Sequence, residues 1–147
     1  MAVPESYDIN RELAEYSFSA TEICKLSHLS PDRPAISLSK FYKVPFLLLF
    51  EGSNFSERAT GMFEEAGLTP NIKMRLSQSV SAFRCAAAGL GATFVVDRLV
   101  KETDNQLKYY KISSSFAKRY NYLLHPRQKY VTAAMNAFIQ YAAKQLS

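Results

Sequence analysis

Small polar residues follow three apolar stretches of this sequence, and they are the residues best suited to binding chemistry. They are Gly52, Ser53, Asn54, Gln78, Ser79 and Asp97, the last of which follows Val96 at the end of the third stretch. Each group precedes an expected helix, whose unpaired N–H groups and positive dipole end attract anions. The sequence therefore predicts a site for a carboxylate or another small anion. Ordinary helix capping uses the same residue types and remains the alternative interpretation.

Signatures of catalysis are absent from the sequence. It has no Gly-x-Ser-x-Gly elbow, no Gly-x-x-x-x-Gly-Lys phosphate loop and no His-Glu-x-x-His zinc motif. Glu51 and Asp97 could form a carboxylate pair for acid–base chemistry, although separate surface acids are the commoner arrangement. His125 lies at an expected strand end, and Cys24 and Cys85 lack the spacing of a metal or disulfide site. We expect no enzyme activity, no cofactor and no bound metal.

The elements that position these residues begin with a continuous apolar run at residues 46–50, which predicts a strand buried on both faces. Asn54 and Glu57 form a capping pair for a helix that Gly67 ends. Alternation at residues 72–76 predicts a strand nearer the edge of the sheet.

A second helix, capped by Ser79 or Ser81, precedes a third strand at residues 93–96 and a short helix at residues 97–101. Strands that alternate with helices over short connections predict a parallel α/β sheet with right-handed crossovers. Ligands of such sheets bind outside the carboxyl ends of the strands, which is where the polar residues lie.

The last part of the chain carries strand patterns at residues 107–112 and 118–124, and then a helix capped by Thr132. The apolar face of that helix comprises Val131, Met135, Phe138, Ile139, Ala142 and Leu146. After Asp104 there are seven lysines and arginines and no acid, in a chain of net charge +5. This bias suits nucleic-acid binding or, as we prefer, a solvated basic strand edge.

Composition indicates one soluble globular domain. The chain has 147 residues, of which 48% are hydrophobic and 21% charged. Its longest apolar run, residues 44–50, is too short to cross a bilayer, and the N-terminus lacks the pattern of a secretory signal. We expect a cytoplasmic protein that does not contact membranes.

Four segments carry a resemblance to a known family. They are AVPESYDIN, VPFLLLFEGSNFSERATGMFEEAGLTP, VSAFRCAAAGLGATFVVDRLV, and KRYNYLLHPRQKYVT followed by AAMNAFIQYAAKQL. In this order and spacing they resemble the C-terminal part of the effector-binding region of LysR-type transcriptional regulators. The resemblance implies an α/β, periplasmic-binding-protein-like (type 2) subdomain with three layers and a mainly parallel mixed sheet.

The resemblance also implies how the chain works. Residues 1–147 would form a single effector-binding subdomain, the second half of the substrate-binding region, with a C-terminal helix at about residues 132–146 and no DNA-binding domain. Gly52, Ser53, Asn54 and Phe55 would face a small-molecule effector, which in this family is frequently an acid. The turn with Gln78 and Ser79 would form a second wall, and Val96 and Asp97 replace a frequent proline at the third. DNA would be bound only through a helix-turn-helix domain that the sequence lacks.

Three functions compete at this point. The leading one is a regulatory module that transmits effector occupancy to DNA-binding domains. A solute-binding protein of the transport type is the alternative, and a small α/β enzyme using Glu51, Asp97 or His125 is a weaker one. Because the last helix lacks its usual docking surface, we expect it to pack on its own sheet or to exchange with a second copy, giving a homo-oligomer.

Overall fold

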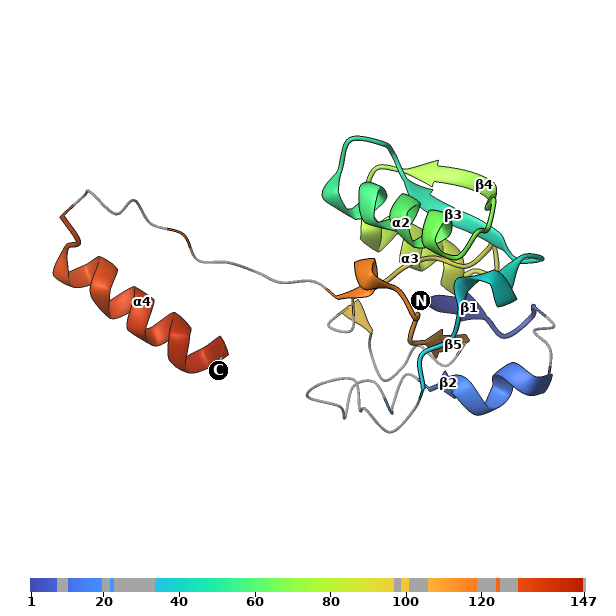
Figure 1. The fold of residues 1–147 in the computed structure, drawn as a ribbon, viewed down its shortest axis with the longest axis horizontal. Helices are drawn as coiled ribbons and strands as arrows, with labels where there is room; N and C mark the ends of the chain where they lie inside the picture. Colours follow the sequence, from blue (N-terminus) through green and yellow to red (C-terminus); the bar gives the residue numbers. More distant parts are fainter. Residues whose placement is uncertain are drawn as a thin grey trace.

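The computed structural model describes residues 1–7, 11–19, 22, 34–96, 99–100, 106–118, 124 and 130–146. The strands and helices α2 and α3 gather in one body, while α4 lies apart from it (Figure 1). The elements are β1 (Ala2–Pro4), η1 (Arg11–Tyr16), β2 (Ser17–Phe18), η2 (Leu38–Phe41), β3 (Pro45–Leu49), α2 (Asn54–Glu65), β4 (Asn71–Leu76), α3 (Ser79–Ala87), β5 (Leu107–Tyr110), η4 (Ser115–Ala117) and α4 (Ala133–Leu146).

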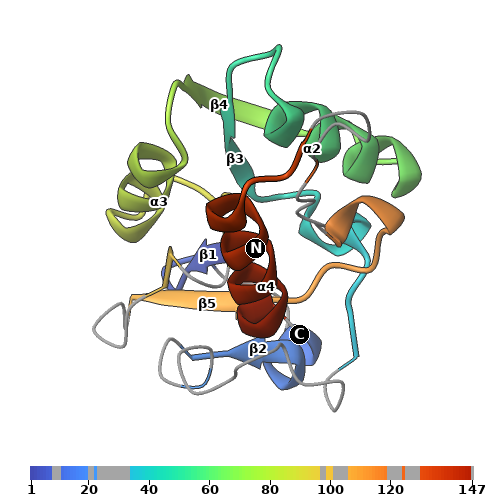
Figure 2. The same ribbon diagram turned by 90° about the vertical axis from the view of Figure 1, so that its left-hand side faces the viewer.

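β3 is the middle layer because its side chains alternate between two hydrophobic clusters. Phe46 packs edge-on against Phe63 of α2, with ring centroids 4.9 Å apart, in one cluster. Leu47 belongs to the other cluster, together with Phe83 of α3. Figure 2 shows α2 and α3 on opposite sides of the β3–β4 pair. The expected strand and its three-layer setting are confirmed, although β3 spans Pro45–Leu49 and Phe50, expected inside the strand, is 57% exposed.

The described strands form two sheets. In one, β3 pairs with β4 in parallel, and in the other β5 pairs antiparallel with both β1 and β2. The segment Ala92–Thr93 joins them, since Ala92 bridges Phe46 in parallel and Thr93 bridges Ala2 in antiparallel fashion. Pairing is mixed as expected: among the described residues the named pairs are two antiparallel and one parallel, and the isolated bridges are one antiparallel and two parallel. Local periodicity does not show how strands separated by most of the chain will pair, so the predicted balance toward parallel pairing was too strong.

Helices α2 and α3 begin close to the predicted positions, but their capping residues differ from those predicted. The cap of α2 is Ser53, which forms a reciprocal capping box with Ser56, so the predicted Asn54–Glu57 pair is wrong. The cap of α3 is Gln78, and its side chain makes no capping hydrogen bond. Ladder pairing of the third expected strand involves Ala92 and Thr93 rather than residues 93–96.

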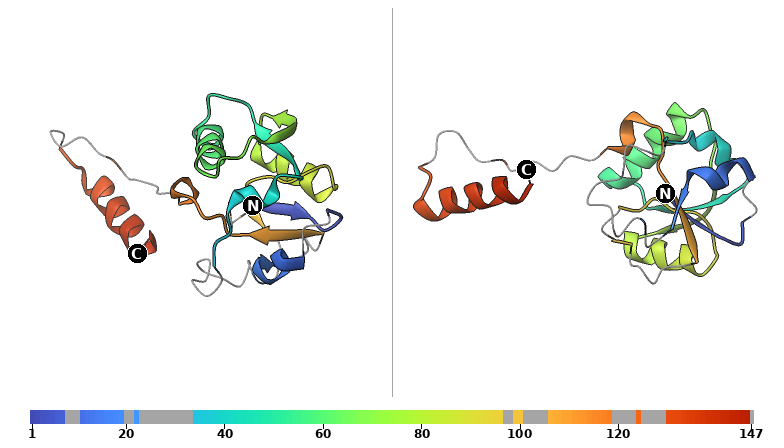
Figure 3. Two further views of the ribbon diagram at one scale, coloured as in Figure 1. Left: turned by 45° about the vertical axis from the view of Figure 1, so that its right-hand side comes forward. Right: turned by 90° about the horizontal axis from the view of Figure 1, so that it is seen from below.

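α4 begins as predicted, because the Met135 N–H donates to the Thr132 hydroxyl over 3.2 Å. Two views in Figure 3 show the helix away from the strands, with no packing on the sheet. Phe138 is 60% exposed and Tyr141 is 64% exposed. Docking on its own sheet is therefore not observed, and exchange with a second copy stays a prediction. The expected strand at residues 118–124 and the helix at residues 97–101 lie largely outside the described residues.

Candidate functional site

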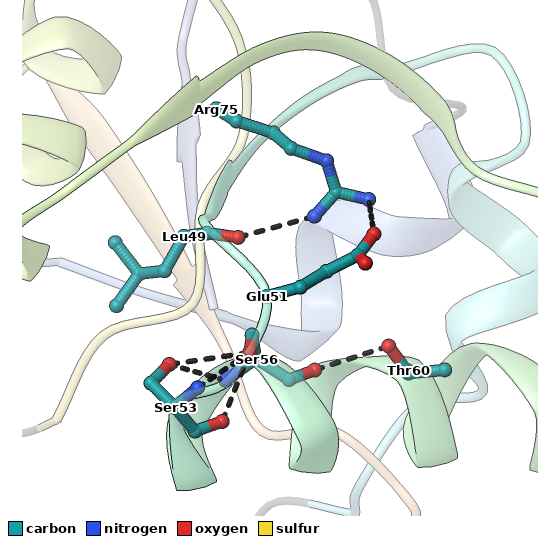
Figure 4. Close-up of polar contacts among 6 residues, drawn as sticks. All are labelled: Leu49, Glu51, Ser53, Ser56, Thr60 and Arg75. Atoms are coloured by element: carbon teal, nitrogen blue, oxygen red, sulfur yellow. Dashed lines mark hydrogen bonds and ion pairs between the residues drawn. The ribbon is translucent and has the colours of Figure 1, made fainter.

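The carboxyl ends of β3 and β4 lie side by side, because Leu49 and Leu76 are register partners. The Phe50 N–H donates to the Leu76 carbonyl over 3.0 Å. Arg75 donates to the Leu49 carbonyl over 3.1 Å and forms a 3.1 Å ion pair with Glu51 (Figure 4). The loop that leads into α2 is therefore anchored on the neighbouring strand.

The hydroxyl groups of Ser53 and Ser56, at the start of α2, accept hydrogen bonds from backbone N–H groups of the same turn. The Ser56 N–H donates to the Ser53 hydroxyl over 3.1 Å, and the Ser53 N–H donates to the Ser56 hydroxyl over 3.3 Å (Figure 4). Gly52 has a φ of +90°, a left-handed conformation that turns the chain into the helix. The hydrogen bonds of Ser53 are therefore those of a helix cap.

A cavity of about 1080 Å³ lies beside α2, at the upper end of the sizes of small-molecule sites, which run to about 1,000 Å³. Its walls come from α2, from the chain after Thr93, from the end of β5 and from the segment that follows it. The lining residues are Met1, Ala35, Asn54, Phe55, Arg58, Met62, Glu65, Phe94, Val95, Val96, Tyr110, Lys111, Ile112, Ser113, Ser114, Ser115, Phe116, Ala117 and Lys118. Most of this wall is apolar, and polar groups make up the rest.

Positive charge predominates among the ionisable side chains of the wall. Arg58, Lys111 and Lys118 face a single acid, Glu65. The Ser114 hydroxyl, and then the Ser115 N–H, hold the pKa of Glu65 below its ordinary value, so its carboxylate is committed to these donors. Burial keeps the Tyr110 phenol neutral by raising its pKa. An anion fits this charge balance, and the first turn of α2 adds its dipole.

Segment Ser114–Lys118 is fastened to α2 by three contacts. The Arg58 guanidinium donates to the carbonyls of Phe116 and Lys118. Glu65 accepts from the Ser114 hydroxyl and, over 3.0 Å, from the Ser115 N–H. The Phe116 ring lies over Gly61, where a Cβ atom would come within 2.8 Å of it. Sequence reasoning missed this segment, although a glycine inside an otherwise regular helix is a signal of close packing.

The predicted site residues fall into three groups. Asn54, Phe55 and Val96 line the cavity. Gly52, Ser53, Gln78 and Ser79 are described, and they lie outside its wall. Asp97 lies outside the described residues, as does His125, so the carboxylate pair of Glu51 and Asp97 has no structural account. A ligand-binding role for all eight predicted residues stays a prediction.

Other kinds of site were sought in the described part of the chain. It contains no group of three or more His, Cys, Asp or Glu side chains placed to hold a metal ion. Within those same residues, no helix combines the length and the apolar character needed to span a membrane.

Comparison with known families places the chain. The model of the LysR substrate binding domain matches residues 17–147. This chain belongs to the LysR substrate-binding domain family. It is accordingly an effector-binding module of the LysR type, with the α/β periplasmic-binding-protein-like fold that the sequence predicts.

Two relatives agree with this placement. The uncharacterized HTH-type transcriptional regulator YcgK of Bacillus subtilis (strain 168) is 25% identical over 114 residues, which are 78% of this chain. The chain spans only 35% of that relative's length. The effector-binding domain of QuiR in complex with shikimate superposes with a TM-score of 0.58 at 14% identity, over 98% of this chain and 58% of that one. The second likeness is one of fold.

Proposed function

We propose that the cavity beside α2 binds a small organic acid, and that its occupancy is transmitted to DNA-binding domains outside this chain. The basic wall carries the proposal, since Arg58, Lys111 and Lys118 outnumber the one acid, Glu65. A hydrogen bond to a charged group contributes about 1.5–3 kcal/mol, enough to select an acid over its neutral analogue. The effector that the QuiR domain holds, shikimate, is itself an acid.

The apolar part of the wall determines which frame the carboxylate of the ligand is attached to. Phe55, Met62, Phe94 and Ile112 line the same cavity as the cations. A ligand that carries its carboxylate on a ring or a short hydrocarbon frame would satisfy both sides. Asn54 adds a neutral amide at the first turn of α2, where backbone N–H groups are also unpaired.

Binding without turnover is the corresponding proposal for chemistry. The ionisable side chains in the wall are one arginine, two lysines, one carboxylate tied to serines, and a neutral phenol. A general base needs a titratable group free to take a proton near the operating pH. The lowered pKa of Glu65 makes its carboxylate a weaker base than an ordinary glutamate. We therefore include the absence of enzyme activity in the proposal.

The domain assignment is part of the same proposal. Residues 1–147 would be one effector-binding subdomain, the second half of a LysR-type substrate-binding region. The coverage of 58% of the QuiR domain supports this, because a further subdomain would account for the remainder. The intact regulator would act in the cytoplasm as a homo-oligomer and would reach DNA through its helix-turn-helix domain.

Titration calorimetry on the chain tests the acid proposal. Shikimate and benzoate are each compared with a neutral partner of the same frame, methyl shikimate and benzamide. We expect at least one acid to bind, and its neutral partner to bind about 10-fold more weakly or worse. Equal affinity within both pairs, or no binding of either acid, would contradict the proposal. To test for turnover, the acids are incubated with the protein and their masses are measured. We expect the masses to be unchanged.

A further inference from the structure

Arg58 contacts both the cavity and the segment Ser114–Lys118. Its side chain lines the cavity, and its guanidinium donates to the carbonyls of Phe116 and Lys118. Both acceptors are neutral, and among the described ion pairs none involves Arg58. The guanidinium thus carries a full charge that two backbone carbonyls do not neutralise.

A carboxylate is a stronger partner for this group than a pair of carbonyls. Arginine presents a planar set of donors that matches the two oxygens of a carboxylate, and such charge-assisted pairs are roughly twice as strong as neutral hydrogen bonds. Glu65 does not take this role on α2, because it lies seven residues from Arg58, about 10 Å along the helix, and its carboxylate bonds to Ser114 and Ser115. An acid in the cavity is therefore the partner that the charge of Arg58 lacks.

We propose that Arg58 exchanges partners: it holds segment Ser114–Lys118 through the carbonyls of Phe116 and Lys118, and it turns to the carboxylate when an acid binds, so that binding releases this segment. The inference rests on the proposed function of the cavity. It assigns the selection of acids to Arg58. It also explains how binding of an acid could act on the segment Ser114–Lys118, which precedes α4 in the sequence.

Few contacts remain to hold the segment once Arg58 lets go. Ser115, Phe116, Ala117 and Lys118 are all exposed, so little apolar burial fixes them. The Phe116 ring on Gly61 and the exposed carboxylate of Glu65 are the other attachments described above. Segments with few buried contacts and solvent-exposed hydrogen bonds open at low cost.

Affinity tests the recognition half of the inference. We expect Arg58→Gln to weaken binding of benzoate and shikimate about 10- to 100-fold while leaving their neutral partners unaffected. Arg58→Lys keeps the positive charge but cannot donate two parallel hydrogen bonds to a carboxylate. Its affinity for the acids should lie between those of the wild type and Arg58→Gln. Arg84→Gln is the matched control, because Arg84 is exposed on α3 and lies outside the cavity wall. Circular dichroism checks that each variant is folded.

Trypsin tests the release half, because it cleaves the peptide bond after Lys118. In the wild-type chain, saturating acid should speed this cleavage about 10-fold, and Arg58→Gln should be fast with or without acid. Gly61→Ala displaces the Phe116 ring without touching the charge of the cavity. It should raise cleavage in the absence of acid and bind acid at least as tightly as the wild type.

The possible outcomes separate the two proposals. If the wild type binds acids and Arg58→Gln binds them equally well, Arg58 does not recognise the carboxylate and this inference fails, while the proposed function stands. If acid slows cleavage after Lys118, the ligand closes the segment and the release is wrong. If neither acid binds the wild type, both proposals fall together.

Discussion

Gly91 is the position where adding one methyl group should damage the fold most. A Cβ atom there would lie 2.6 Å from the Pro45 carbonyl oxygen and 3.2 Å from the Leu47 side chain. Contacts between carbon and oxygen begin at about 3.3 Å, so Gly91→Ala must displace the backbone by about 0.7 Å. The next residue, Ala92, donates to that same carbonyl over 2.8 Å and accepts from the Leu47 N–H over 2.8 Å.

The magnitude follows from these two ladder bonds. A shift of about 0.7 Å stretches a bond of this length to the limit of hydrogen bonding, near 3.5 Å, and leaves a buried partner unsatisfied at about 1–3 kcal/mol each. We expect Gly91→Ala to lower the free energy of unfolding by about 2–6 kcal/mol. With a urea slope of about 2 kcal/mol/M, the midpoint of urea unfolding should fall by about 1–3 M.

Gly61→Ala is the matched control, since it makes the same chemical change against a movable neighbour. Its Cβ would meet ring carbons of Phe116, whose side chain is 42% exposed and can swing outward. Alanine also favours the helix interior by about 1 kcal/mol over glycine, which offsets the lost contact. We expect a change within about 1 kcal/mol. Equal loss of stability in the two variants would refute the argument from the Pro45 carbonyl.

Three smaller effects can be measured on the same chain. Ser53→Ala removes the cap of α2 and should cost about 1 kcal/mol in urea unfolding, whereas no loss would mean that the capping box is not formed. Thr93→Val removes the buried 2.8 Å hydrogen bond to the Leu47 carbonyl, and a penalty of about 1–3 kcal/mol is expected for the orphaned acceptor. The lowered pKa of Glu65 contributes stability above the pKa of the unfolded chain, and this contribution disappears as the pH falls through the folded pKa. NMR titration of the Ser115 amide should follow that loss, and a midpoint at or above the ordinary glutamate pKa would contradict it.

Local patterns in the sequence predicted the central unit well. The apolar run that becomes β3, the alternation that becomes β4 and the Thr132 cap of α4 each have a short-range physical cause. The start of α2 was misplaced by one residue because Ser53 and Asn54 are both favourable caps. The conformation of Gly52 and the partner Ser56 decide between them, and neither is visible in a pattern of residue types.

The site was harder to predict because its walls come from distant parts of the chain. Asn54 and Val96 follow from the rule that ligands gather at the carboxyl ends of strands, and both line the cavity. Arg58 and Lys111 do not follow from it, since their roles depend on where the chain runs after β5. Arg58 and its acceptor Phe116 are 58 residues apart, a distance over which periodicity carries no information.

The segment Ala92–Thr93 joins the two sheets. Four backbone hydrogen bonds, two to β1 and two to β3, run through these two residues. The hydrophobic clusters on the two faces of β3 each contain residues of both sheets, with Phe46 and Tyr110 in one and Leu47 and Tyr109 in the other. Close packing on both faces therefore holds the two sheets in one orientation, and with them the cavity wall to which Arg58 and Tyr110 both belong.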